Sequence, residues 1–383
     1  MKKILFIFIA YLLFIFNSYL FSQENNKLKI GLLAPFTGEY KELGNSILFS
    51  LQLALEEIDD KDVIILPRDS GSGDVKKLNT SLKELIEEEV KVVIGPIKSD
   101  EFEEVKKFKE LIFISPSNFN PEVDENVLSI GISLESQLIA LSKFINKQKK
   151  TKTLLLYPNN EYSEMIEKKI KKINLSLNKK FKYSPDPKVL TGEIEKLTNY
   201  SQRKKNLNRR IKLLEKRDDP ASLRELKLLE QKYTLGKVNF DSVIVIDFGN
   251  SLKSLLTSLI FSDVNQEEIL FTTVNQWFDK SIFFENSLKT LYYPSVKYKN
   301  FEKYSNTYFK YFKNYPSEIT ILTYDALGLI YYVWKKNRGI NSIKDFLIKE
   351  KIRGKIGTFS YKNGSIFQEL EIYRVKDKKF TKF

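Results

Sequence analysis

The chain has 383 residues, of which 63 are Lys or Arg and 49 are Asp or Glu, and it contains neither Cys nor His. This length predicts two domains, and an apolar fraction of 42% is enough to fill two cores. Because thiols and imidazoles are absent, disulfides, Cys nucleophiles, Ser-His-Asp triads and Cys/His zinc sites are excluded. A formal net charge of +14 favours acidic surfaces or polymers as partners, and it also suits simple solubility.

The first residues predict an export signal. Two lysines precede an apolar run over residues 4–16, and a short cleavage-like stretch ends at Ser22. We therefore predict a signal peptide over residues 1–22. An uncleaved membrane anchor is the alternative, because the apolar stretch is roughly long enough to span a bilayer. In both cases we expect the remaining chain outside the cytoplasm, and without a Cys at the cleavage point a lipoprotein is excluded.

Strand-like runs then alternate with amphipathic helical stretches. The first series has predicted strands over residues 28–33, 63–66, 90–94 and 111–114, with predicted helices over 45–58, 75–88 and 101–109. This order implies right-handed βαβ crossovers and a parallel sheet. In the second helix, Leu78, Leu82 and Leu85 share one face, and Asp74 is the predicted N-cap.

A second α/β series follows the first. A strand-like run and a helix over residues 127–130 and 134–145 form the first crossing, and the series then has strands over 153–157, 242–246 and 269–272 and helices over 161–175 and 251–261. The helix Ile319–Trp334 is apolar on most sides, so we predict that it is buried in the first lobe. The last two strand-like runs, 355–359 and 370–375, are expected to return to the first lobe or to the hinge.

One segment interrupts this alternation. Residues 196–217 contain nine Lys or Arg and one Glu, and Leu207, Ile211 and Leu214 form a helical stripe. Asp219 and Pro220 can start a second helix. We predict a basic helical hairpin over residues 196–233 in which this stripe packs against the second helix, on Leu223, Leu226 and Leu229. The predicted partner surface on the hairpin consists of Arg203, Arg209, Arg210 and Arg217. A solvated decoration without partners is the alternative.

Three loops of the first lobe follow the carboxyl ends of strands, where open α/β sheets bind ligands. They cover residues 35–40, 95–100 and 115–121. Backbone N–H groups there could bind an anion, with a hydroxyl from Ser99 or Ser117, although ordinary turns use the same residue types. The Gly-rich stretch 69–74 lacks the Gly-Lys-Ser/Thr ending of a phosphate-binding loop and is predicted to be only a loop.

No catalytic residue, metal ligand or cofactor is assigned. The three glutamates over residues 87–89 point in different directions around a helix end, and a carboxylate pair formed in space stays open as a hydrolase alternative. Tyrosines and lysines alternate after residue 292 and could stack on sugars or bases. The helical spacing of Tyr304, Tyr308 and Tyr311 instead predicts an aromatic face that packs inward. We expect no nucleic-acid partner, because the chain is exported.

Several further motifs follow one another along the chain: Lys29–Gly38, Val92–Pro96, Ile114–Pro116 with Asn120–Glu122, Tyr157–Tyr162 and Thr323–Ala326. Their order is similar to that in type I periplasmic binding proteins, the family of leucine-binding-protein domains. The chain resembles this family from about residue 27 to its end, apart from the hairpin. The resemblance implies an α/β fold of two Rossmann-like lobes that close on a small ligand. Residues 23–132 and 317–383 would form the first lobe, and residues 133–316 the second.

The resemblance also implies a ligand site. Amino-acid receptors of this family hold the ligand carboxylate with the loops after the third and fourth strands, which here contain Ser99, Ser117, Asn118 and Phe119, and Tyr162 would face them from the second lobe. Phe119 stands where a Thr is expected, and residues 274–276 contain no acid for the ligand ammonium. Both departures would leave a bound amino acid underpaired. We therefore predict weak or absent leucine binding.

The hairpin and the stretch Pro67–Asp69 resemble one branch, the penicillin-binding-protein activators, which stimulate peptidoglycan synthases. This resemblance implies a non-enzymatic adaptor in the periplasm whose partner is a peptidoglycan synthase or another envelope protein. The alternative is the solute receptor of a branched-chain amino acid or amide ABC transporter. Its partners would be a small ligand in the cleft between the lobes and the transporter permease.

Overall fold

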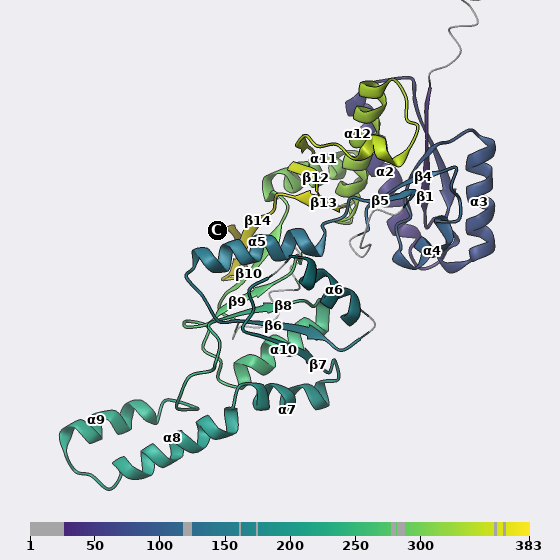
Figure 1. Ribbon diagram of the computed structural model, residues 1–383. Coiled ribbons are helices and arrows are strands. Elements are labelled where there is room, and N and C mark those ends of the chain that lie inside the picture. The colour runs from purple at the N-terminus through teal and green to yellow at the C-terminus, as the bar shows by residue number, and fades with distance from the viewer. Residues whose placement is uncertain are drawn as a thin grey trace, which may run out of the picture. The chain divides into compact units, whose positions relative to one another are not determined.

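The computed structural model describes residues 27–117, 125–160, 162–173, 175–276, 281, 288–355, 358–362 and 365–383. The predicted signal over residues 1–22 and two candidate ligand residues, Asn118 and Phe119, lie outside these ranges. The chain divides into two compact units (Figure 1). Among the described residues, the first contains those within 27–131, those within 304–349 and residue 365, and the second contains those within 132–303, 350–362 and 366–383.

The first unit is built on a five-stranded sheet in the order β2-β1-β3-β4-β5. The strands are β1 (Leu28–Ala34), β2 (Val63–Asp69), β3 (Val92–Ile94), β4 (Ile112–Ser115) and β5 (Val127–Ser129). All neighbouring strands are parallel, as the alternating pattern predicts.

Helices follow the strands of this unit in the predicted order. They are α2 (Lys41–Ile58), α3 (Val75–Glu87), α4 (Phe102–Val105) and α12 (Thr320–Asn337), with short 3-10 turns η1 (Gly71–Gly73), η2 (Ser99–Glu101) and η4 (Ile343–Phe346). The Asp74 carboxylate accepts hydrogen bonds from the N–H groups of Lys76 and Lys77 at 3.0 and 3.2 Å. The predicted N-cap of α3 is therefore confirmed, and so is its buried leucine face.

The late helix α12 packs against α2 in the first unit, and most of its apolar residues are buried. This confirms the prediction for residues 319–334. The helix α11 (Tyr298–Phe312) also contacts α2: the hydroxyl groups of Tyr304 and Tyr308 donate to Ser50 and Ser46 at 2.8 and 3.1 Å. These contacts join residues 304–316 to the first unit, so their predicted place in the second lobe is wrong.

The inward prediction for Tyr311 is also wrong, because this side chain is 54% exposed. The inward row of α11 runs from Tyr304 through Tyr308 to Phe312, which stacks on Phe49 with ring centroids 4.5 Å apart. Phe312 therefore occupies the position that the tyrosine spacing assigned to Tyr311.

The second unit contains a seven-stranded sheet in the order β15-β14-β10-β9-β8-β6-β7. Its strands are β6 (Thr153–Pro158), β7 (Lys179–Tyr183), β8 (Ser242–Val245), β9 (Leu270–Thr273), β10 (Leu291–Ser295), β14 (Glu371–Lys376) and β15 (Lys379–Lys382). The strands from β6 to β10 are parallel, whereas β10, β14 and β15 pair antiparallel.

The end of the chain thus completes the second sheet, and its predicted return to the first lobe or hinge is wrong. Without β14, the polar backbone of β10 would form an open sheet edge. Tyr373 and Val375 of β14 lie opposite Tyr293 and Leu291 and join the same core cluster. A further small sheet is formed by β11 (Ile352–Arg353), β12 (Thr358–Lys362) and β13 (Ser365–Gln368).

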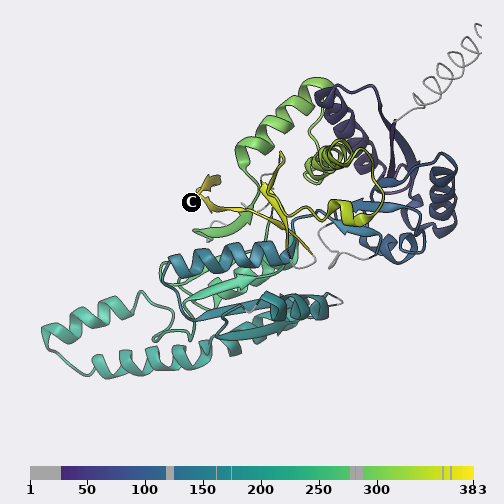
Figure 2. The same cartoon turned by 45° about the horizontal axis from the view of Figure 1, so that its top comes forward.

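The helices of the second unit are α5 (Leu134–Lys147), α6 (Ser163–Ile173), α7 (Pro187–Leu197), α8 (Tyr200–Leu214), α9 (Pro220–Leu229) and α10 (Gly249–Phe261). Figures 1 and 2 both show α8 and α9 side by side as a hairpin that extends away from the sheet of its own unit. Among the helices of the described residues, none is long and apolar enough to cross a membrane.

Candidate functional site

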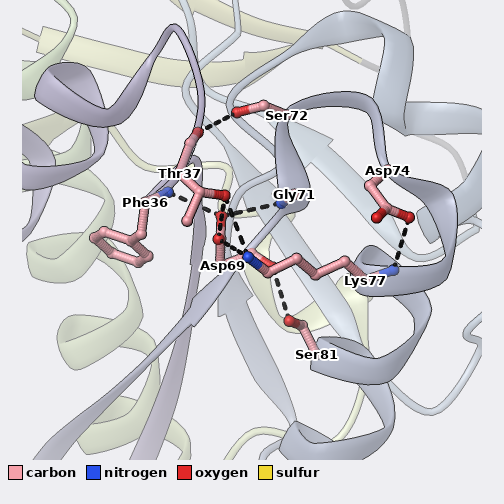
Figure 3. Close-up of polar contacts among 8 residues, drawn as sticks. All are labelled: Phe36, Thr37, Asp69, Gly71, Ser72, Asp74, Lys77 and Ser81. Atoms are coloured by element: carbon pink, nitrogen blue, oxygen red, sulfur yellow. Dashed lines mark hydrogen bonds and ion pairs between the residues drawn. The ribbon is translucent and has the colours of Figure 1, made fainter.

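At the carboxyl edge of the first sheet, Asp69 connects the loops after β1 and β2 (Figure 3). Its carboxylate accepts hydrogen bonds from the N–H groups of Phe36 and Gly71 at 2.9 and 3.0 Å and from the hydroxyl of Thr37 at 2.6 Å. Lys77 Nζ lies 2.5 Å from the same carboxylate. Burial opposes ionisation, but the bonds from Lys77 and Thr37 outweigh it and lower the pKa of Asp69 to about 2.

These contacts join the end of β2 to the loop after β1, to its own loop and to helix α3. Ser72 adds a hydrogen bond from its hydroxyl to the Thr37 carbonyl at 2.7 Å, and the Ser81 hydroxyl donates to the Asp69 carbonyl at 2.7 Å. Because the Asp69 carboxylate is already satisfied, it braces the Gly-rich loop instead of offering a site for a ligand. No pattern in the sequence predicted a structural role for Asp69.

The loops after β3 and β4 meet through serine hydroxyls. The Ser115 hydroxyl donates to the Pro96 carbonyl at 2.6 Å, and the Ser117 N–H donates to Ser115 Oγ at 3.1 Å. Gly95 allows the chain after β3 to pass close to β1, since a Cβ there would lie 2.5 Å from the Leu33 carbonyl oxygen. Ser117 is buried, and the backbone of Ser99 lies in η2 after β3. The structure thus places both predicted serines at one edge of the first sheet.

A buried carboxyl group, Glu101, lies in the same loop region and was not predicted. Its side chain is only 4% exposed. Burial raises the pKa of Glu101 to about 7, and the negative charge of Asp100 adds to the shift. The neighbouring cation Lys98 forms its ion pair with Asp100 at 2.9 Å. Burial of a loop residue depends on neighbouring loops and is not visible in its own sequence.

The corresponding edge of the second sheet carries Tyr162 and an unexpected acid. Tyr162 follows β6 and is 38% exposed. Asp247 follows β8 and is buried; its carboxylate accepts hydrogen bonds from the Tyr183 hydroxyl and, at 2.7 Å, from the Phe248 N–H. Burial and the charge of Asp247 raise the pKa of Tyr183. Gln276, after β9, donates its amide to the Asp247 carbonyl at 2.9 Å.

Asp247 changes one sequence expectation. An acid was sought only among residues 274–276, whereas the carboxyl ends of β8 and β9 meet at one edge of a parallel sheet. Within the residues that the structure describes, the Asp247 carboxylate has no Lys or Arg partner. Residues 274–276 contain no acid, but the neighbouring strand β8 carries one to the same edge. The sequence does indicate this acid, because Asp247 directly follows the strand predicted over residues 242–246. The family resemblance points only to the residues after the next strand, β9.

The basic hairpin folds largely as predicted. Leu207 and Leu214 of α8 pack on Leu229 of α9, with Ile211 and Leu226 at the margin of the cluster. Asp219 caps α9 by accepting the Ser222 N–H at 2.9 Å, which confirms the predicted helix start. The prediction for Leu223 is wrong, because it is 47% exposed and the buried Ser222 takes the inward position.

Arg203 does not belong to the exposed surface of the hairpin. Its side chain is buried at the base, where the guanidinium donates to the carbonyls of Thr198, Asp263 and Ser262 at 3.0, 3.1 and 2.5 Å and to the Thr234 hydroxyl at 2.9 Å. Burial lowers the pKa of Arg203, and the charge of Asp263 opposes this shift. The predicted partner role of Arg203 is therefore wrong, because the side chain anchors α8 to the end of α10.

The other three predicted arginines differ in their surroundings. Arg210 pairs with Glu225 through two hydrogen bonds, at 2.8 and 2.6 Å, and is half-buried. Arg209 and Arg217 are exposed, as predicted. The expectation that Arg210 is largely exposed is wrong, since the bidentate pair covers part of its guanidinium.

A pocket of about 1110 Å³ lies beside Arg203. Its walls are residues 231–238 and the segments that precede β6, β8 and β9. It therefore lies at the amino edge of the second sheet, opposite the edge that carries Tyr162 and Asp247. No sequence motif pointed to this pocket.

Comparisons with known proteins agree with this architecture. Residues 27–174 match a family model described as periplasmic binding protein, and none of the curated proteins compared matches the chain. A putative branched-chain amino acid ABC transporter protein from Rhodospirillum rubrum is similar in structure, with a TM-score of 0.70, 11% identity and coverage of 93% of this chain and 100% of that one. The leucine binding protein from Thermotoga maritima gives a TM-score of 0.60, 12% identity and coverages of 93% and 97%.

The C-domain of LpoA from Haemophilus influenzae, a regulator of PBP1A, gives a TM-score of 0.59, 12% identity and coverages of 93% and 99%. At such low identities these similarities show the fold alone. The fold is that of type I periplasmic binding proteins, with two α/β units. The predicted fold class and the predicted resemblance to this family are confirmed.

Proposed function

We propose that this protein with a type I periplasmic binding protein fold is a non-enzymatic adaptor that binds an envelope protein through the α8–α9 hairpin and supports cell-wall synthesis. The observation that carries the proposal is the way the hairpin is built. Arg203 fixes its base with four hydrogen bonds, and a leucine cluster joins its two helices. Such an arm holds its exposed face in a defined orientation, as a partner surface requires.

The exported location belongs to the same proposal. Residues 1–22 have the composition of a signal peptide, and family relatives act as binding proteins of the periplasm. Mass spectrometry of the protein purified from cells would test cleavage. A mature amino terminus near Gln23 supports it, and a protein that retains residues 1–22 supports the membrane-anchored alternative.

The partner can be tested by photo-crosslinking in cells. A crosslinking amino acid at Arg209 should capture a peptidoglycan synthase, because this exposed position lies on the hairpin. The same amino acid at Lys168, exposed on α6, serves as the control and should not capture that protein. Capture of a transporter permease at Arg209 would contradict the adaptor proposal.

A second candidate, a solute receptor, is favoured by one observation, the buried carboxylate of Asp247 without a basic partner among the described residues. A ligand ammonium would pair with it. Calorimetric titration with leucine separates the two functions. Micromolar binding that is lost in Asp247→Asn but kept in Asp241→Asn would support the receptor, because Asp241 precedes β8 at the opposite edge and is held by backbone N–H groups. Absence of binding supports the adaptor.

A further inference from the structure

Some of the positive charge on α8 already has partners within the second unit. Arg203 is buried at the base, and Lys204 Nζ lies 5.9 Å from the centre of the Tyr200 ring. Arg210 is paired with Glu225. These cations are occupied, so a surface for an acidic partner must be formed by the others.

Three other cations of α8, Lys205, Arg209 and Lys212, lie four and three residues apart, which places them on one face of the helix. We call these three residues the α8 basic row. All are exposed, and in the part of the chain that the structure describes none of the three has an ion pair, a hydrogen bond or a ring contact. At a rise of about 1.5 Å per residue, the row is roughly 10 Å long. Like charges at this spacing destabilise a helix, and an acidic partner would remove that repulsion.

An exposed apolar side chain continues the row. Leu213 lies four residues after Arg209 and is 51% exposed. An anionic polymer in water would pair with the charges and leave Leu213 in solvent. A protein helix with acidic and apolar side chains on one face would cover Leu213 as well as the charges, which favours a protein as the partner.

Resting on the proposed function, we propose that the α8 basic row binds an acidic helix of the partner protein. Carboxylates of that helix repeat at the same spacing of four and three residues, and an apolar side chain beside them covers Leu213. A single exposed ion pair contributes little binding free energy, so binding requires partner carboxylates opposite all three cations of the row. The charges also speed association and make it sensitive to salt.

Synthetic peptides test this proposal directly. The matched probe is an Ala-rich helical peptide with Glu residues at a spacing of four and three and Leu beside the last Glu; the control peptide has the same composition with Glu distributed around the helix. We expect fluorescence anisotropy to show that the protein binds the matched peptide at least about tenfold more tightly than the control peptide. Equal affinity for the two peptides would overturn the proposal.

Charge variants locate the binding site. Reversal of the row in Lys205→Glu, Arg209→Glu and Lys212→Glu should weaken binding of the matched peptide at least about tenfold. The matched control reverses three exposed lysines elsewhere in the second unit, Lys168, Lys376 and Lys379, and should change affinity less than about twofold. Equal losses in both variants would show that only net charge matters and would overturn the proposal.

Two further arms complete the test. If the reversal variant does not fold, as judged by circular dichroism, a variant with Gln at Lys205, Arg209 and Lys212 replaces it in the binding test. Phosphatidylglycerol vesicles serve as the lipid probe. Vesicle binding that depends on the row, without peptide binding, overturns the proposal in favour of a membrane surface. If a crosslinker at Arg209 captures a synthase but the protein does not bind the matched peptide, the acidic-helix proposal is rejected and the proposed adaptor function is retained.

Discussion

The Asp69 site of the first unit and the Arg203 site of the second both use a charged side chain to hold the backbone together, but they neutralise its charge differently. Asp69 has the opposite charge of Lys77 beside it. Arg203 donates its hydrogen bonds to three carbonyls and one hydroxyl, the charge of Asp263 acts on it without an ion pair between them, and it is the more deeply buried of the two. A buried cation held by neutral acceptors depends on all of them being in place.

This comparison separates charged side chains that make structural contacts from those that are available to bind a partner. Both residues stand in sequence where a binding role is plausible, one in a strand-end loop and one in a basic segment. Both are engaged in structural contacts, whereas the α8 basic row of Lys205, Arg209 and Lys212 is not. If this contrast holds, substitution of a charged side chain that makes structural contacts should lower stability, and substitution of an exposed one should not.

The largest effect is expected at Arg203. Arg203→Met leaves three carbonyls and a hydroxyl without their donor and should lower the free energy of unfolding by about 3–4 kcal/mol. Urea unfolding followed by circular dichroism measures this loss. The control Lys204→Met, next in sequence and exposed, should change stability by less than about 0.5 kcal/mol. Equal effects in the two variants would show that Arg203 is not an anchor.

Glu101 is a buried charge without an ion pair among the described residues, and it should respond to pH. Its pKa is raised to about 7 from 4.5, so the folded state holds the proton more strongly than the unfolded state. Stability contributed by the protonated form is therefore lost as the pH rises from about 5 to 7, by about 2–3 kcal/mol. Glu101→Gln should abolish this dependence in unfolding curves measured between pH 5 and 8. A slope that persists in the variant would contradict the assignment.

Asp69 should show the opposite dependence on pH. Its pKa is lowered to about 2 from 3.8, so its contribution is present above pH 4 and is lost as the pH falls toward 2. The shift corresponds to about 2 kcal/mol. Asp69→Asn should lower stability by about this amount at pH 7 and flatten the acid limb of the stability curve. An unchanged acid limb would mean that Lys77 and Thr37 do not hold the carboxylate in solution.

The smallest effect is expected at the partly exposed surface pair of Arg210 and Glu225. Arg210→Ala should leave the melting temperature close to that of the unchanged protein, because exposed ion pairs contribute little to folding. Differential scanning calorimetry would measure it. A large fall in the melting temperature would place this pair with Arg203 among the anchors.

Local patterns in the sequence predicted much of the fold. The Leu78, Leu82 and Leu85 face, the caps at Asp74 and Asp219 and the apolar helix near residue 320 depend on periodicity and turn chemistry, and all are confirmed. The antiparallel pairing of β14 with β10 was not predicted, because nothing in an amphipathic strand says which sheet edge it completes.

The site was harder to predict because its residues are brought together by tertiary contacts. An exposed arginine and the buried Arg203 look alike in a basic segment, and the tertiary approach of Thr234 and residues 262–263 distinguishes them. Asp247 was missed because the acid lies on the strand next to the one searched. Ser99 and Ser117 were correctly placed at one edge because strand ends in a parallel sheet meet there.

A crosslinking scan around α8 tests the central claim most directly. A photo-crosslinking amino acid would be placed in turn at Lys205, Arg209 and Lys212 of the row and at Lys168 of α6 and Lys188 of α7, which are exposed on other helices of the second unit. We predict capture of the same envelope protein from the three row positions and from neither of the other two. Equal capture from all five positions, or capture from Lys168 and Lys188 alone, would contradict the assignment of the row as the partner surface.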